Sequence, residues 1–162
     1  DMSNLTVVKG DTGWILFDPL MSIECSQAAM QLIEKNLGSY PVKAVIISHP
    51  HADHFGGILG VMKEEDAADA SLSIEEQLAS GKIPVIVPEG FAEHAIAENV
   101  YAGKAMTRRA NYQYGVLLTP GVTGKMAQGI GMGQSTGTVS YLAPTYEIKT
   151  TGETLVIDGI QM

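Results

Sequence analysis

A cluster of metal-binding residue types constrains this chain more than any other feature of its sequence. Three of the four histidines and one aspartate fall within the six residues His49–His54, in the order H-x-H-x-D-H. They directly follow the apolar run Val42–Ile47, which is typical of a β-strand covered on both faces. The chain must therefore fold so that a buried strand ends at a polar cluster, and the sequence predicts a metal site there.

The spacing of the first two histidines fits one metal ion. In extended backbone, residues two apart point the same way, so His49 and His51 are expected to close on the same ion. Pro50 lies between them and disfavours helical dihedral angles at the residue before it, which keeps His49 extended. A surface loop that happens to be rich in histidine is the alternative, and the spacing after a buried-strand pattern argues against it.

Asp53 and His54 are expected to hold a second ion from the other side of the same cavity. Gly56 and Gly57 follow them and would permit a sharp change of direction. Imidazole nitrogens with one carboxylate suit zinc, with iron or manganese as alternatives. A catalytic site of this kind keeps one coordination position for water and lowers the pKa of that water to about 7.

The composition fits a single globular domain. A chain of 162 residues, 45% of them hydrophobic, can bury one core of ordinary size. No apolar run approaches the ~20 residues that a membrane span requires, and the first residues lack the pattern of a signal peptide. The formal net charge of −8 argues against nucleic acid and anionic membranes as partners. The single Cys25 cannot form an internal disulfide and indicates nothing about the compartment.

Alternating strand and helix patterns predict a layered α/β fold. The expected strands are Leu5–Val8, Trp14–Phe17, Val42–Ile47, Lys82–Val87, Thr138–Leu142 and Thr154–Ile157. The expected helices run from Ser22 or Glu24 to Leu37, from Gly57 to Lys63, and through most of Phe91–Tyr114. An acidic stretch near residues 64–80 is expected to be a solvated helical insertion at the surface.

Several other residues have both a functional and a structural interpretation. Asp18 ends the second expected strand, where its carboxylate could orient a ligand histidine or simply form an Asp-Pro turn. His94 could be a distant metal ligand, although a position on a helix face or beside the site suits it better. Glu93 and Glu98 on the same helix are expected to be surface or packing residues.

Two further segments leave alternatives open. Lys104, Arg108 and Arg109 could bind an anion such as sulfate, but a solvated helix face is the commoner arrangement. The glycine-rich run Gly121–Gly137 breaks the G-x-G-x-x-G pattern at its third glycine. It is therefore interpreted as a wall near a substrate pocket or as an irregular structural loop.

Two blocks of the sequence together resemble the alkyl/aryl-sulfatases of the metallo-β-lactamase superfamily, which degrade detergents such as dodecyl sulfate. The first block, Ser48–Gly57, would alone indicate only the superfamily. The second block is Pro88–Arg109, with the sequence PEGFAEHAIAENVYAGKAMTRR, and it points to the sulfatases. The later segments Gly137–Thr145 and Thr154–Gly159 are similar to the same family.

The resemblance implies a metallo-β-lactamase fold, an αββα sandwich that is incomplete here at its C-terminal side. It implies two zinc ions, with His49 and His51 at one, Asp53 and His54 at the other, and Asp18 beneath them. The family's remaining ligands and its dimerisation domain would lie beyond Met162. Residues 1–162 are therefore interpreted as the N-terminal part of a catalytic domain.

For the intact enzyme, the resemblance implies zinc-dependent hydrolysis of a small alkyl sulfate ester to an alcohol and sulfate. A homodimer with a periplasmic or secreted location is also implied by the family. The alternatives are another hydrolase of the same fold, such as a lactonase, a thioesterase or a β-lactamase. A further alternative is that the chain alone is a catalytically silent fragment that binds metal weakly, because half of its ligands are missing.

Overall fold

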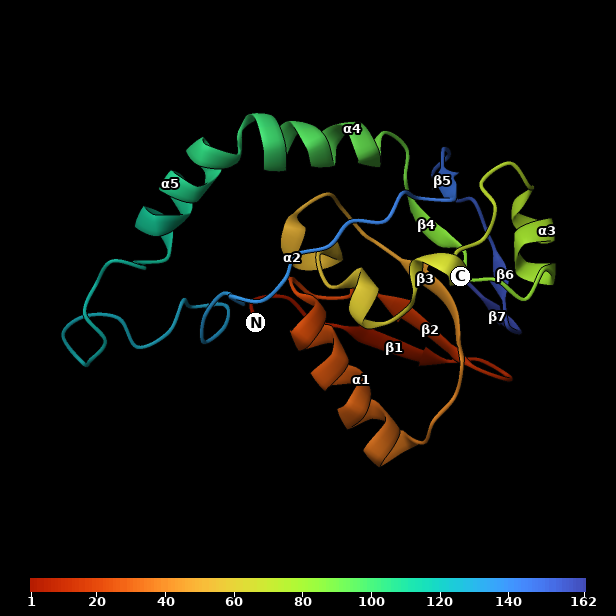
Figure 1. Cartoon of the computed structure of the whole chain (residues 1–162), viewed down its shortest axis with the longest axis horizontal. Helices are drawn as coiled ribbons and strands as arrows, with labels where there is room; N and C mark the ends of the chain where they lie inside the picture. Colours follow the sequence, from red (N-terminus) through yellow and green to blue (C-terminus); the bar gives the residue numbers. More distant parts are fainter.

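A mixed sheet with helices on both faces forms the body of the computed structural model, which describes residues 1–162 (Figure 1). The sheet has the strand order β1-β2-β3-β4-β5. Its strands are β1 (Thr6–Lys9), β2 (Trp14–Phe17), β3 (Val42–Ile46), β4 (Val85–Pro88) and β5 (Tyr146–Ile148). Only β1 is antiparallel to its neighbour, and a separate antiparallel ribbon joins β6 (Val156–Ile157) to β7 (Ile160–Gln161). The predicted α/β class is confirmed.

The helices surround this sheet, and part of the helical chain reaches beyond it (Figure 1). The α-helices are α1 (Ile23–Leu37), α2 (Ala52–Phe55), α3 (Ile74–Ala79), α4 (Phe91–Ile96) and α5 (Gly103–Gln113). Short 3₁₀ turns are η1 (Ile58–Gly60) and η2 (Glu64–Asp66), and a π-helical turn, η3 (Ala97–Tyr101), joins α4 to α5. Together α4, η3 and α5 form an arm that projects from the sheet. None of these helices combines the length and the apolar character that a membrane crossing requires.

Alternate residues of the central strands are buried on opposite faces of the sheet, as the two-residue period of a strand requires. One face packs against α2 and α4 in the cluster Val45, Ile47, Phe55, Ile58, Met62, Val85, Val87, Phe91, Ala95 and Leu142. The other face packs against α3 and β6 in the cluster Ile15, Ala44, Ile74, Ile86 and Ile157. Burial on both faces explains why β3 and β4 are continuously apolar in the sequence.

The first long helix is capped at both ends. Ser22 is the N-cap of α1, and its side-chain oxygen accepts a hydrogen bond from the backbone N–H of Cys25. Gly38 ends the helix with φ of 99°, a conformation that favours glycine. The helix predicted from Ser22 or Glu24 to Leu37 is therefore confirmed.

Two expected elements differ from the structure, and one strand was not expected. Residues 57–63 form only a 3₁₀ turn, and Thr138–Leu142 is not a strand. The latter segment instead satisfies its backbone outside the sheet, because Ser140 N–H donates to Gly56 O and Thr138 O accepts from Ile23 N–H. The edge strand β5 was not predicted, because its three half-buried residues carry too short an alternating pattern.

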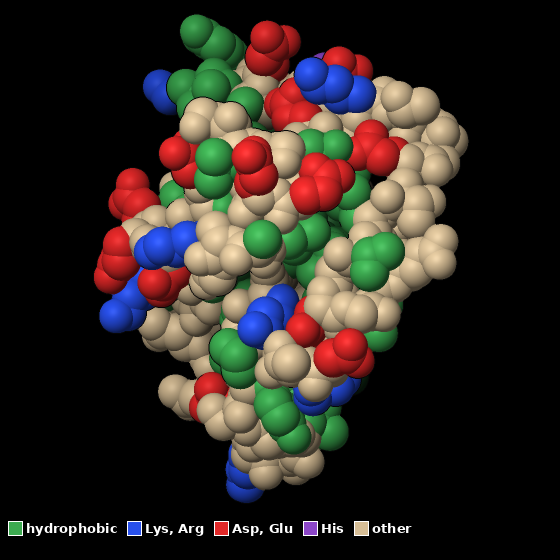
Figure 2. Space-filling model, turned by 90° about the vertical axis from the view of Figure 1, so that its right-hand side faces the viewer, with side chains coloured by type: hydrophobic (Ala, Val, Ile, Leu, Met, Phe, Trp, Pro, Cys, Tyr) green, Lys and Arg blue, Asp and Glu red, His purple; other side chains and the backbone are tan.

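The acidic stretch near residues 64–80 is less solvated than predicted. Its helix α3 buries Ile74 in the second core cluster, and buried Gln77 donates from Nε2 to Thr145 O at 2.9 Å. The acidic side chains remain at the surface, as Figure 2 shows for the face that carries α3 and the β6–β7 ribbon. This stretch lies away from the histidine cluster, so its charge belongs to the outer surface of the fold.

One carboxylate tethers the β1–β2 turn to the C-terminal ribbon and gives a prediction for stability. Asp158 accepts hydrogen bonds from Thr12 N–H (2.8 Å), Gly13 N–H (2.7 Å) and Thr12 Oγ1–H (2.7 Å). Burial acts to raise the pKa of Asp158, but these hydrogen bonds outweigh it and the pKa is lowered. A lowered pKa stabilises the fold above the unfolded-state pKa, and this contribution is lost as pH falls through the folded value.

We expect Asp158→Asn to lower the free energy of unfolding at pH 7 by about 1 kcal/mol, since solvent screens this partly exposed group. The gap between wild type and variant should narrow as the pH falls from 5 to about 3, where the wild-type carboxyl is progressively protonated. Urea denaturation at each pH measures this difference, with Asp11→Asn as a control on the same turn. A difference in free energy of unfolding that stays constant with pH would contradict a lowered pKa of Asp158 in the folded chain.

Candidate metal centre

The cluster predicted from the sequence lies where two neighbouring parallel strands end. Strands β2 and β3 pair in parallel with Phe17 opposite Ile46, so Asp18 and the segment after Ile47 leave the same edge of the sheet. The histidines then occupy the loop after β3 and the first turn of α2. In open α/β sheets this carboxyl edge is the usual place for a binding site.

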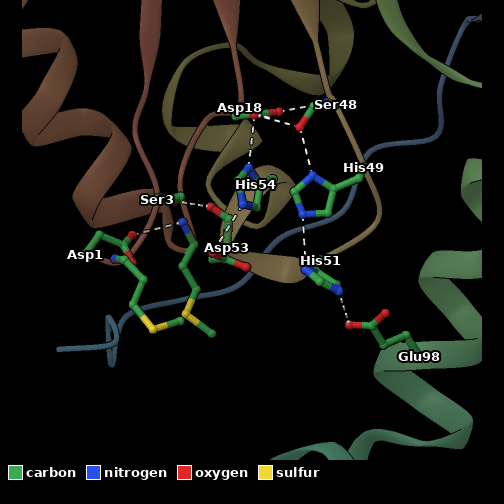
Figure 3. A network of polar contacts seen from close by, with 11 residues as sticks. Asp1, Ser3, Asp18, Ser48, His49, His51, Asp53, His54 and Glu98 are labelled. Carbon is green, nitrogen blue, oxygen red and sulfur yellow. Dashed lines mark hydrogen bonds and ion pairs between the residues drawn. The ribbon is translucent and has the colours of Figure 1, made fainter. Parts of the chain in front are cut away.

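Asp18 connects the separate parts of this edge (Figure 3). Its Oδ1 accepts from Ser48 N–H at 2.7 Å, and its Oδ2 accepts from Ser48 Oγ–H at 2.7 Å. The same Oδ2 lies 3.0 Å from His54 Nδ1. The backbone of Asp18 has φ of 56°, a left-handed conformation that aspartate tolerates better than most residues. The carboxylate therefore does more than form an Asp-Pro turn, because it contacts a histidine of the cluster.

His49 faces Ser48 with one ring nitrogen and His51 with the other. Its Nδ1 lies 2.9 Å from Ser48 Oγ, and its Nε2 lies 3.1 Å from His51 Nδ1. Burial lowers the pKa of His49, and the neighbouring imidazoles of His54 and His51 lower it further. The neutral ring is thus favoured, and neutral imidazole is the form that binds a metal ion.

Asp53 and His54 form a second pair on α2. Asp53 Oδ2 lies 3.3 Å from His54 Nε2, the nitrogen that does not face Asp18. The rings of His49 and His54 are 4.0 Å apart between centroids, so the two pairs are adjacent (Figure 3). The structure therefore brings His49, His51, Asp53 and His54 together as the sequence predicts, although their role as ligands stays a prediction.

The donor distances allow a test of whether these residues fit metal ions. Two nitrogen ligands at 2.0–2.1 Å from a tetrahedral zinc lie about 3.3 Å apart. The observed separations of 3.1 Å and 3.3 Å within the two pairs match such a ligand–ligand edge. No group of three or more His, Cys, Asp or Glu side chains is arranged to hold an ion. Each pair thus has the donor spacing of two ligands on one ion, and the binding of two ions stays a prediction.

A polar cavity of about 510 Å³ opens onto this cluster. Asp18, His51, Asp53 and His54 line it together with the N-terminal residues Met2, Ser3, Asn4 and Thr6 and with Tyr114 and Ile130. Ile130 belongs to the glycine-rich run, so part of that run forms a wall of the cavity. That this cavity takes substrate stays a prediction, and the run itself is irregular in structure.

Sequence reasoning missed two residues that reach the cluster from the arm. Glu98 Oε1 lies 3.3 Å from His51 Nε2, and Asn99 Nδ2 donates to Pro50 O at 3.2 Å. Glu98 was expected to be a surface or packing residue. No spacing in the sequence connects it with His51, because the two meet only where α4 and η3 pack over the end of the sheet.

The remaining candidates are not brought to the cluster. His94 is exposed on α4, where it lies beside Gly90, and has no polar contact with the other histidines. Lys104, Arg108 and Arg109 lie on α5, on a solvated surface of the arm. The structure thus supports the commoner interpretation for each of them.

The two glycines after His54 serve a different purpose from the predicted one. Gly56 has φ of −60° and Gly57 has φ of −92°, which are ordinary values for any residue. The two residues do lie in a turn, as predicted, but the turn does not depend on the conformational freedom of glycine. A Cβ atom at Gly57 would instead overlap Ser26 Oγ and the carbonyl oxygen of Pro19. Glycine is needed there because the turn packs directly on α1 and its preceding loop.

The fold and the paired donors at its carboxyl edge are of the metallo-β-lactamase kind. The chain belongs to the metallo-beta-lactamase superfamily, whose sequence pattern matches residues 1–121, and membership implies binding of divalent metal. Over 99% of its length it is 48% identical to a linear primary-alkylsulfatase of Pseudomonas sp. and 41% identical to an alkyl/aryl-sulfatase of Saccharomyces cerevisiae. The resemblance to alkylsulfatases is thereby confirmed over the whole chain.

A solved structure supports the same relationship. The stereoselective inverting sec-alkylsulfatase from Pseudomonas sp. superposes with a TM-score of 0.85, at 35% identity over 99% of this chain. The chain spans 24% of that structure's length, and 22% and 23% of the two sequence relatives. Its similarity thus covers about a quarter of each relative.

Proposed function

We propose that this chain forms part of the catalytic domain of a zinc-dependent enzyme that hydrolyses alkyl sulfate esters to an alcohol and sulfate. The observation that carries the proposal is the pairing of His49 with His51 and of Asp53 with His54 at one edge of the sheet. The 48% identity to a linear primary-alkylsulfatase supports this choice among the hydrolases of the superfamily.

Each side chain has a specific role in this proposal. His49 Nε2 and His51 Nδ1 would hold one zinc ion, while Asp53 Oδ2 and His54 Nε2 would hold the second. When bound, zinc supplies the Lewis acidity that activates water and neutralises the charge of an anionic ester. Asp18 holds His54 directly and His49 through Ser48, so that both rings keep their orientation.

A second cavity supports a substrate with a hydrocarbon tail. This apolar cavity of about 530 Å³ is lined by Ala52, Phe55, Ala95, Ile96, Asn99, Val100, Val139, Ser140 and Tyr141. Helix α2 separates it from the metal-binding residues, because Asp53 and His54 face the cluster while Ala52 and Phe55 face the cavity. An ester head group at the cluster would therefore have an apolar surface within reach for its alkyl chain.

The same geometry favours a catalytically inactive chain when residues 1–162 are studied alone. Only one pair of donors is available at each metal position, so open positions would be filled by water and the affinity for metal would be low. We therefore expect no appreciable sulfatase activity from the isolated chain. The homodimer that the family resemblance implies stays a prediction.

Release of inorganic sulfate from dodecyl sulfate tests the proposed function. We expect no release by the chain alone, but release by a chimera in which residues 1–162 replace the aligned segment of the Pseudomonas primary-alkylsulfatase. A chelator should abolish the activity of the chimera, and added zinc should restore it. A folded chimera that hydrolyses a lactone, thioester or β-lactam but no alkyl sulfate would overturn the proposal in favour of another hydrolase of this fold.

A further inference from the structure

The three histidines of the cluster each present one ring nitrogen to a neighbouring donor and the other to a partner outside the pairs. His54 Nδ1 contacts Asp18 at 3.0 Å, and His49 Nδ1 contacts Ser48 Oγ at 2.9 Å. For His51 the outside contact is Glu98, whose Oε1 lies 3.3 Å from Nε2. His51 is thus the histidine that depends on the arm for its orientation.

The hydrogen bonds around Ser48 fix which nitrogen of His49 carries a proton. Ser48 Oγ already donates its hydrogen to Asp18 Oδ2 at 2.7 Å, so it can only accept from His49. His49 Nδ1 therefore carries the hydrogen, and its Nε2 presents a lone pair to His51 Nδ1. His51 Nδ1 faces this lone pair either with a lone pair of its own or with an N–H, depending on the tautomer of His51.

We propose that Glu98 is a positioning residue that fixes His51 in the Nε2–H tautomer, which rests on the proposed function of the cluster as a metal centre. An ionised carboxylate only accepts hydrogen bonds, so it selects the tautomer with a hydrogen on Nε2. Nδ1 of His51 then presents its lone pair to the lone pair of His49 Nε2, 3.1 Å away. Two lone pairs directed at the same space form a site for a cation.

The arm is built to hold Glu98 at this place. Glu98 and Asn99 are successive residues of the π-helical turn η3, and such turns often occur at functional sites. Asn99 Nδ2 donates both to Pro50 O, between the two histidines, and to Ala95 O one turn earlier. The His51 side chain is 53% exposed, whereas Glu98 is only 26% exposed, so the better-fixed carboxylate orients the freer ring.

Nitrogen-15 NMR of the metal-free chain at pH 8 tests the tautomer directly. We expect wild-type His51 to be in the Nε2–H form. In Glu98→Ala the Nδ1–H form should appear, because Nδ1–H can then donate to His49 Nε2. Glu98→Gln should largely keep the wild-type tautomer, since its amide oxygen still accepts. Glu93→Ala, on the exposed side of α4, is the matched control and should leave the spectrum unchanged.

Affinity for Co²⁺, followed by its visible absorption, gives the second measurement. Loss of an orienting partner typically costs 10–100-fold in metal affinity, so we expect Glu98→Ala to bind about 10-fold more weakly or worse and Glu98→Gln to bind closer to wild type. Should Glu98→Ala fail to fold, Glu98→Leu removes the acceptor while keeping the apolar stem.

The two measurements separate the positioning role from the proposed function. If His51 changes its tautomer in Glu98→Ala and the Co²⁺ affinity falls as expected, Glu98 is confirmed as its positioning residue, even if the chimera releases no sulfate. If His51 stays in the Nε2–H form in the folded Glu98→Ala and Glu98→Leu variants, the inference is overturned, whatever the chimera hydrolyses. An unchanged Co²⁺ affinity in these variants would also contradict it.

Discussion

Replacing His49 and His51 together by alanine is expected to lower the zinc affinity of the first metal position by more than about 100-fold. The variant removes both nitrogens of a pair that is only 3.1 Å apart, and no further donor of the chain is arranged to replace them. The zinc content of purified wild-type and variant chains, measured by plasma emission spectrometry after equilibration with limiting zinc, gives the result.

The control for this variant is His94→Ala, which removes a histidine that is exposed on α4 and does not contact the cluster. Its zinc content should equal that of the wild type. Equal zinc in the double variant would show that these residues are not ligands. A wild-type chain that binds no zinc would show that the His49–His51 pair does not suffice and that the position requires further ligands.

A large loss of stability is expected when a single methyl group is added at Gly57. Gly57→Ala should lower the free energy of unfolding by about 3 kcal/mol or more, because the new Cβ would overlap Ser26 Oγ and the Pro19 carbonyl oxygen. Both partners are fixed, since Ser26 is fully buried and its hydroxyl donates to that same carbonyl. Thermal unfolding followed by circular dichroism should show a midpoint lowered by about 6–12 °C.

Gly103→Ala is the matched control for this substitution. Gly103 lies in α5, and no atom lies within 4 Å of the position that its Cβ would take. The same change of residue should therefore stabilise the chain by about 0.4–1 kcal/mol, since alanine favours a helix. A Gly57→Ala chain as stable as wild type would mean that the turn can move away from α1.

Local sequence patterns predicted those helices and strands that pack against the apolar core. The strands β2, β3 and β4 were identified because burial makes them nearly continuously apolar in the sequence. The helix α1 was identified because its apolar residues recur at helical spacing before Gly38. Thr138–Leu142 has the composition of a strand but pairs with the backbone of Gly56 and Ile23. Its partners are set by tertiary contacts that no short window of sequence contains.

The candidate site likewise contains residues that local sequence predicted and residues that only tertiary packing brings in. The four paired donors and Asp18 are close in sequence to the ends of β2 and β3, so strand geometry brought them together in the prediction. Glu98 and Asn99 come from more than forty residues further along the chain, and their approach depends on the packing of the arm. The need for glycine at position 57 was likewise invisible, because it arises from contact with another helix and not from the local backbone.

The bonds made by Asp18 have a thermodynamic consequence. Through Ser48 this one carboxylate orients His49 of the first pair, and through Oδ2 it orients His54 of the second. An ion that immobilises either ring also restrains the carboxylate of Asp18. Binding of the second ion then costs less conformational entropy, because the residue that orients the other pair is already ordered. The two proposed metal positions should therefore fill cooperatively, and the coupling free energy between them would be a property of Asp18.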